Sequence, residues 1–117
     1  MMSPITCNNA EKANIFIVRP SGYLDEAGGH ELRKAFDSPI QKGFKKFILD
    51  LVGTPVINSQ GITQILELGE ALLYDQKATL AIIGLSDLYL DVFRVVGITK
   101  FAKTYSDEKA ALEALGG

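Results

Sequence analysis

Short apolar segments rich in β-branched residues alternate along the chain with longer segments whose apolar residues recur every three or four positions. The first pattern predicts strands and the second predicts helices. Strands are expected at residues 5–7 (a short edge strand), 14–20, 46–50, 78–83 and 101–105 (a weak strand). Helices are expected at residues 26–36, 59–75, 87–96 and after residues 106–108. This alternation predicts a single α/β domain with a largely parallel sheet.

Several short segments refine this scheme. Tyr23 to Asp25 are expected to continue the second strand briefly. Ser38 and Pro39 are expected to cap and begin one further helical turn, which Gly43 ends. Gly69, on the apolar face of the helix at residues 59–75, is expected to permit a close approach to the sheet.

The most informative segment runs from Phe47 to Gly61. An apolar strand leads into Asp50, a second apolar pair follows at residues 56–57, and the small polar residues 58–60 then open a helix. Such residues at a strand-to-helix junction leave backbone N–H groups facing solvent, where an anion or a partner protein can bind. We therefore expect the functional site at this junction.

Two interpretations of Ser59 remain open at this point. Its hydroxyl either caps the helix, which is worth about 1 kcal/mol, or accepts a phosphoryl group. A phosphate would add up to about two negative charges at a favourable helix terminus, so it would leave the fold intact while repelling a docked protein.

The helix expected at residues 87–96 is apolar on nearly all sides. Ser86 is placed to cap it and Gly97 to end it. One side must face the sheet, and the rest either packs against other elements or is left for a partner. The pattern does not separate these two alternatives.

Composition narrows the class of protein. The 117 residues carry a net charge of −2, and no basic cluster exceeds Lys45 and Lys46, which argues against nucleic-acid binding. A single Cys7 and a single His30 leave no credible metal set. No signal peptide or membrane-spanning apolar run is recognised, so a reduced cytoplasmic domain without membrane insertion is expected.

One candidate catalytic motif fails on its chemistry. Residues 50–54 (DLVGT) invite comparison with the DxDGT motif of haloacid-dehalogenase-like phosphatases, in which the second Asp acts as acid and base. Val52 occupies that position here and cannot exchange a proton. Asp50 is therefore expected to accept hydrogen bonds from nearby backbone N–H groups, and we expect no enzymatic activity and no cofactor.

Five segments in order resemble the STAS domain family, to which bacterial anti-sigma factor antagonists belong. They are residues 21–25 (the family's G-x-L-D), 47–51 (a hydrophobic strand ending in D-L), 57–61 (D-S-[ST]-G), 81–85 (l-x-G-l) and 96–98 (x-x-G-l). The resemblance covers nearly the whole chain. It implies a STAS-like single domain over residues 1–117, with a mixed, mostly parallel sheet of four to five strands covered by about four helices.

The resemblance also implies a partner switch. Family members bind an anti-sigma factor, often a GHKL-type serine kinase, and so release a sigma factor. The kinase phosphorylates a Ser or Thr directly before the glycine, which breaks the complex, and a phosphatase restores it. Here that position is Gln60, which has no hydroxyl, and the preceding acidic position is Asn58. The chain is therefore either a constitutive binder or is switched at Ser59.

By this resemblance the expected partner-binding residues are Asp25, Asn58, Ser59, Gln60, Gly61, Ser86 and Asp87. The alternative is a STAS accessory subunit of a membrane transporter, such as a lipid ABC system, because such subunits also resemble this domain and need no phosphorylation. The sequence leaves both functions open, together with a homodimer.

Overall fold

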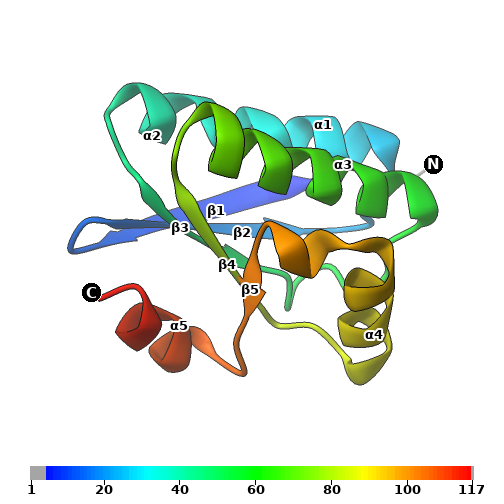
Figure 1. Ribbon diagram of the computed structural model, residues 1–117. Helices are drawn as coiled ribbons and strands as arrows, with labels where there is room; N and C mark the ends of the chain where they lie inside the picture. The colour runs from blue at the N-terminus through cyan, green and yellow to red at the C-terminus, as the bar shows by residue number, and fades with distance from the viewer. Residues whose placement is uncertain (1–4, 117) are drawn as a thin grey trace.

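The computed structural model describes residues 5–116 as one five-stranded sheet with helices on both faces (Figure 1). The strands are β1 (Thr6–Lys12), β2 (Ile15–Ser21), β3 (Lys46–Asp50), β4 (Thr79–Ile83) and β5 (Lys103–Thr104). The α-helices are α1 (Glu26–Lys34), α2 (Asp37–Gln41), α3 (Ser59–Glu70), α4 (Asp87–Val96) and α5 (Glu108–Ala114). A π-helical turn, η1 (Ala71–Asp75), extends α3, and a 3₁₀ turn, η2 (Ile98–Lys100), follows α4.

The strands lie in the sheet in chain order, β1-β2-β3-β4-β5. β1 and β2 form an antiparallel hairpin, and β2 to β5 run parallel to one another. The predicted mixed, mostly parallel α/β sheet is thus confirmed. Because β2 to β5 all run in the same direction, their carboxyl ends lie at the same edge of the sheet.

The first strand is longer than its sequence predicts. β1 extends to Lys12 rather than ending at Cys7, and all seven of its residues pair with β2. Asn and Glu residues disfavour strands, so the pattern alone stops early. Pairing along the whole of β2, through a tight turn in which Ala13 has a φ of 56°, overrides that local preference.

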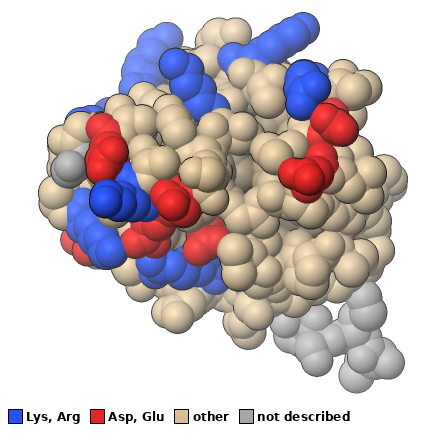
Figure 2. All heavy atoms as spheres, turned by 90° about the horizontal axis from the view of Figure 1, so that it is seen from below, with Lys and Arg blue, Asp and Glu red and all other residues tan. Residues whose placement is uncertain are grey.

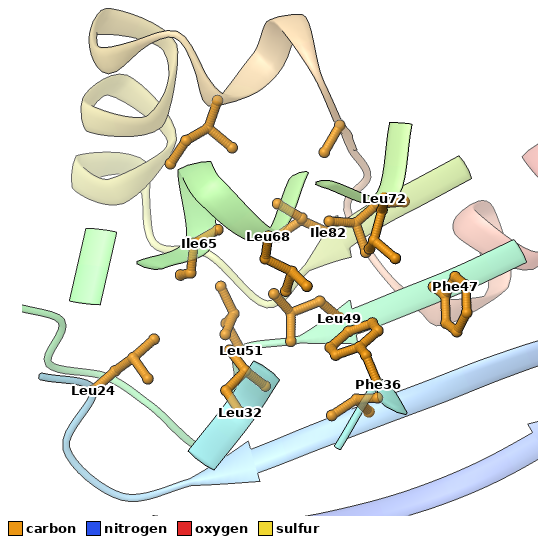
Figure 3. Close-up of a cluster of buried hydrophobic side chains, with 14 of the residues drawn as sticks. Leu24, Leu32, Phe36, Phe47, Leu49, Leu51, Ile65, Leu68, Leu72 and Ile82 are labelled. Carbon is orange, nitrogen blue, oxygen red and sulfur yellow. The ribbon is translucent and has the colours of Figure 1, made fainter. Parts of the chain in front are cut away.

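The sheet alternation separates two cores. Phe16 and Val18 face the helices α1 to α4, whereas Ile15 and Ile17 face α5. The larger core, part of which Figure 3 shows, also holds Phe36, Phe47, Leu49, Leu51, Ile65, Leu68, Leu72 and Ile82. Because Phe47 and Ile48 are both fully buried, on opposite faces of β3, the near-continuous apolar run predicted there is explained.

Three local predictions need correction. α2 begins at Asp37 with Phe36 at its N-cap position, so Ser38 is not the cap and Pro39 is the third helical residue rather than the first. The predicted helix at residues 59–75 is α-helical only to Glu70 and π-helical beyond it. Gly69 approaches Phe101 rather than the sheet, since a Cβ atom there would lie 3.2 Å from the Phe101 Cβ.

The predicted strand at residues 101–105 is reduced to two residues, Lys103 and Thr104. Residues 23–25 contribute only an isolated bridge, from Leu24 to Ile57. Beyond Lys103 and Thr104, the backbone pairing of these segments is isolated: Leu24 bonds to Val56 and Asn58, and the N–H of Tyr105 donates to Ile82 O.

α1 and α3 pack side by side at a glycine. A Cβ atom on Gly29 of α1 would lie 2.4 Å from both Cβ and Cγ of Gln64 on α3. Gln64 is 7% exposed, and its Oε1 atom has no hydrogen-bond partner among residues 5–116. The glycine that weakens the start of α1 as a helix former therefore allows the two helices to approach closely.

Substituting Gly29→Ala tests this contact, because helix propensity predicts a higher free energy of unfolding and packing predicts a lower one. Alanine alone would stabilise a helix by about 1 kcal/mol relative to glycine, but the overpacked methyl group costs about 1–3 kcal/mol. We expect a net loss in the free energy of unfolding, measured by urea denaturation. Ala27→Gly, at an exposed position of the same helix, is the control for propensity. A more stable Gly29→Ala variant would contradict the close contact.

Candidate functional site at the carboxyl edge of the sheet

Three connections meet at the carboxyl edge of the parallel strands: residues 22–25 after β2, 51–58 after β3 and 84–86 after β4. Backbone hydrogen bonds join the first two. The N–H of Gly22 donates to Gly53 O (3.0 Å), that of Leu24 to Val56 O (3.1 Å) and that of Asn58 to Leu24 O (3.1 Å). These bonds place the starts of α1 and α3 next to each other.

The side chains that cap the helices come from these connections. Asp25 Oδ1 accepts from Gly28 N (2.7 Å) at α1, Asn58 Oδ1 from Gly61 N (2.9 Å) at α3, and Ser86 Oγ from Tyr89 N (3.3 Å) at α4. The cap of α3 is therefore Asn58, not Ser59. Asn58 has an extended backbone (φ −86°, ψ 178°), and Ser59 is already the first helical residue.

The seven predicted partner-binding residues all lie on these connections or at the helix starts that follow them, but they differ in exposure. Four side chains are exposed: Ser59, Gln60, Ser86 and Asp87. Asp25 and Asn58 are partly buried, and their carboxyl and amide groups are engaged in capping.

Gly61 is buried, and a Cβ atom there would lie 2.2 Å from Leu24 O. It therefore shapes the site by allowing the start of α3 to pass this carbonyl group, and it offers no side chain to a partner. Contact with a protein bound here would be made chiefly by the four exposed residues.

Tyr89 supports the site and was not identified from the sequence. Its hydroxyl accepts a hydrogen bond from Ile57 N (3.0 Å) and donates one to Ile57 O (3.1 Å), so it ties α4 to the connection that precedes α3. In the sequence of an apolar helix, a tyrosine cannot be distinguished from a residue that only packs in the core. No signal in the sequence distinguishes its hydroxyl as a link between segments 32 residues apart.

Tyr89→Phe tests this link. Because the substitution leaves the partly buried amide and carbonyl of Ile57 without their partner, we expect a loss of about 1–3 kcal/mol in the free energy of unfolding. Amide hydrogen exchange at Ile57 should accelerate. The control is Tyr74→Phe, at a tyrosine that is 58% exposed and whose hydroxyl makes no hydrogen bond within residues 5–116. Equal effects of the two substitutions would rule out a special role for Tyr89.

A chain of charges supports the same edge from the α5 side. Asp50 Oδ1 accepts from Val52 N (3.0 Å), as the sequence predicts, and Asp50 Oδ2 lies 3.6 Å from Arg19 Nε. Arg19 also pairs with Glu108 of α5, which in turn binds Lys12 (2.7 Å). The connection after β3 is thus linked to the helix on the opposite face.

The hydrogen bond from Lys12, with the pairing to Arg19, holds the pKa of Glu108 below its ordinary value of 4.5, against the opposing effect of partial burial. A carboxyl group with a lowered pKa in the folded protein stabilises the fold above its unfolded pKa, and this contribution is lost as the pH falls through the folded pKa.

We expect Glu108→Gln to lower the free energy of unfolding by about 0.5–1 kcal/mol at pH 7. The difference from wild type should shrink as the pH is lowered below 4.5. Urea denaturation at several pH values measures it. Glu113→Gln, at an exposed residue of α5 without an ion pair in the described part of the chain, is the control. A difference that persists unchanged at acid pH would exclude the ion pairs as its cause.

The apolar helix at residues 87–96 is buried on one side only, so the structure leaves part of its apolar surface uncovered. Phe93 of α4 is buried, but Leu88 is 67% exposed and Val95 is 85% exposed. Near the start of α4, Val52 is 72% and Val56 54% exposed. Figure 2 shows the underside of the molecule, where acidic side chains gather at the left and upper right and further basic side chains lie along the upper edge. A broad surface without Lys, Arg, Asp or Glu lies between the acidic side chains.

Within residues 5–116, no group of three or more His, Cys, Asp or Glu residues is arranged to hold a metal ion. In the same range, no helix has both the length and the apolar character that crossing a bilayer requires. His30 is exposed on α1.

Comparisons with known proteins bear on the family and the fold of this chain. The family model of the STAS domain matches residues 6–111. A search of curated proteins found no match.

Solved structures share this fold. An anti-sigma factor antagonist from Mycobacterium paratuberculosis is 18% identical, with a TM-score of 0.81 and coverage of 100% of both chains. An anti-sigma factor antagonist (STAS) domain protein from Planctomyces limnophilus is 20% identical, with a TM-score of 0.74 and coverage of 93% of this chain and 96% of that one. The Bacillus cell fate determinant SpoIIAA, in its phosphorylated form, is 16% identical, with a TM-score of 0.69 and coverage of 94% and 99%.

At these identities the structural likeness establishes the fold, which is that of solved anti-sigma factor antagonists. The family match establishes the family as well as the fold, because it spans nearly the whole chain from β1 into α5. The chain belongs to the STAS domain family.

Proposed function

We propose that this protein is a non-catalytic regulator that binds an anti-sigma factor, often a GHKL-type serine kinase in this family, and thereby releases a sigma factor. The observation that carries the proposal is the exposed first turn of α3, where Ser59 and Gln60 stand beside the start of α1 in a STAS fold. Ser86 and Asp87, exposed at the start of α4, extend the same edge.

Gln60 removes the usual acceptor position at the start of α3, which leaves either a constitutive binder or a switch at Ser59. Gln60 occupies the usual acceptor position and has no hydroxyl, so no phosphoryl group can be transferred to it. The one hydroxyl in this turn belongs to Ser59, whose side chain is exposed and makes no hydrogen bond within the described residues. Ser59 is thus accessible to a kinase, and its place at the helix start would accommodate a phosphate electrostatically.

The first experiment captures partners from a lysate of the source organism with the wild-type protein and the Ser59→Asp variant. Mass spectrometry identifies the partners and any phosphorylated residue. Ser38→Asp is the matched control, because Ser38 is also exposed in the first turn of a helix but belongs to α2.

Each outcome has a distinct meaning. An anti-sigma factor lost only with Ser59→Asp, together with phosphate on Ser59, would support a switch at this residue, reversed by a phosphatase. An anti-sigma factor retained without any phosphate would support a constitutive binder. Capture of a transporter ATPase subunit in place of an anti-sigma factor would favour the transport alternative and overturn the proposal.

A second experiment tests the surface itself. In the Ser59→Lys/Gln60→Asp double variant Asn58 and Gly61 are unchanged, so the cap of α3 is kept while the exposed charge changes. Because a central interface residue contributes about 2 kcal/mol or more, we expect at least about a 30-fold loss of affinity for the captured anti-sigma factor. Isothermal titration calorimetry measures it, with circular dichroism to verify folding. Undiminished affinity would place the interface elsewhere.

A further inference from the structure

A hollow of about 420 Å³ lies beside the start of α4. Its walls are the connections that follow β3 and β4, with Val52, Pro55 and Leu85 among the lining side chains. Leu88, which is largely exposed, follows the lining residue Ser86 in the first turn of α4. The hollow and its border therefore present apolar carbon to the outside.

The walls of this hollow are held in place before any partner binds. Asp50 fixes Val52 through its backbone N–H, and Tyr89 fixes Ile57 through both backbone groups. Gly84 has a φ of +83°, and a Cβ atom there would lie 2.5 Å from Val52 N, so the two walls touch at their base. A bound side chain would thus enter a preformed cavity, which lowers the entropic cost of binding.

One exposed carboxylate, that of Asp87, lies at the border of the hollow. Asp50 lies at its base, near Gly84, and Asp87 is exposed beside Ser86. Arg19 is already engaged with Asp50 and Glu108, and Arg94 with Asp91 (3.0 Å). No ion pair within residues 5–116 involves Asp87. The exposed Asp87 carboxylate would therefore attract a cationic group of a partner.

We propose that the hollow receives a hydrophobic side chain from a partner protein, and that a Lys or Arg close to it in the partner's sequence pairs with Asp87. Apolar lining with an unpaired carboxylate at the border fits a segment that carries both kinds of residue. The inference rests on the proposed function in one respect, because the same partner would cover Ser86 and Asp87 at the start of α4.

A displayed library of random peptides tests the inference without knowledge of the natural partner. The purified full chain selects binders, and a consensus peptide is then synthesised and its affinity measured by fluorescence anisotropy. We expect a consensus that combines an aliphatic or aromatic residue with a nearby Lys or Arg. Its binding should shift the backbone NMR signals of Val52, Leu85 and Tyr89.

Variants then locate the peptide. Val52→Lys and Leu88→Ser should each weaken it by at least about tenfold, since each removes exposed apolar area that the peptide would cover. Val95→Ser is the matched control, because Val95 is the most exposed hydrophobic residue of α4 but lies outside the hollow. Its affinity should remain that of wild type.

A charge exchange tests the role of Asp87. Replacing the consensus Lys or Arg by Glu should weaken binding to the wild-type protein, and Asp87→Lys should restore it. A structural role of Asp87 in starting α4 would not produce this rescue. Affinity independent of the charge at residue 87 would overturn the pairing.

The remaining outcomes overturn the proposal. Three of them come from the peptide library: no enriched binders, a consensus that lacks either residue type, or binding that Val52→Lys does not affect. The fourth is a dimer in sedimentation that Leu88→Ser abolishes, which would identify a second copy of the chain as the occupant. Failure of the proposed function has a different signature. If the hollow binds its peptide but no anti-sigma factor is captured, the site stands without that function; if a captured anti-sigma factor ignores Val52→Lys, the function stands without the site.

Discussion

The backbone pairing of Leu24 with the segment before α3 is the constraint on which the site depends. Leu24 is fully buried, and its N–H and C=O groups bond to Val56 and Asn58 on either side of Ile57. Since Asp25 starts α1 and Asn58 starts α3, this one bridge fixes both helix starts relative to each other. Any side chain at Gly61 would collide with the Leu24 carbonyl and separate the two helices.

Most residues of the site either shape it or can contact a partner, and Ser86 does both because it caps α4 and is exposed. Asp25, Asn58, Gly61 and Tyr89 are at least partly buried, and Asp25 Oδ1, Asn58 Oδ1 and the Tyr89 hydroxyl bond to backbone groups within the domain. Ser59, Gln60, Ser86 and Asp87 are exposed beside them. A rigid frame under exposed side chains suits protein recognition, because little conformational freedom is lost when a partner binds.

The same edge combines polar and apolar surface. The polar turn at the start of α3 and the apolar hollow beside α4 are joined through the Tyr89 hydroxyl, which bonds to Ile57 one residue before Asn58. In the proposed function, the first would determine whether binding is regulated and the second would supply hydrophobic contact. The ion pairs from Asp50 through Arg19 to Glu108 connect this edge to α5. The helix on the opposite face of the sheet therefore helps to hold the connection that follows β3.

Local sequence determined the order and type of the main elements. Continuous apolar runs predict β3 and β4 because both of their faces are buried, and recurring apolar residues predict α3 because one side of it packs on the sheet. The motif order around residues 21–25 and 57–61 identified the family, and the missing hydroxyl at Gln60 follows from residue identity alone.

The tertiary structure decided the features that depend on distant segments. The length of β1 follows from its pairing with β2, the role of Gly29 from its contact with Gln64, and the role of Tyr89 from its bonds to Ile57. Local propensity contains no information about any of these partners. The same limit applies to α4: an apolar helix pattern cannot tell which residues a neighbour will cover, and only packing left Leu88 and Val95 exposed.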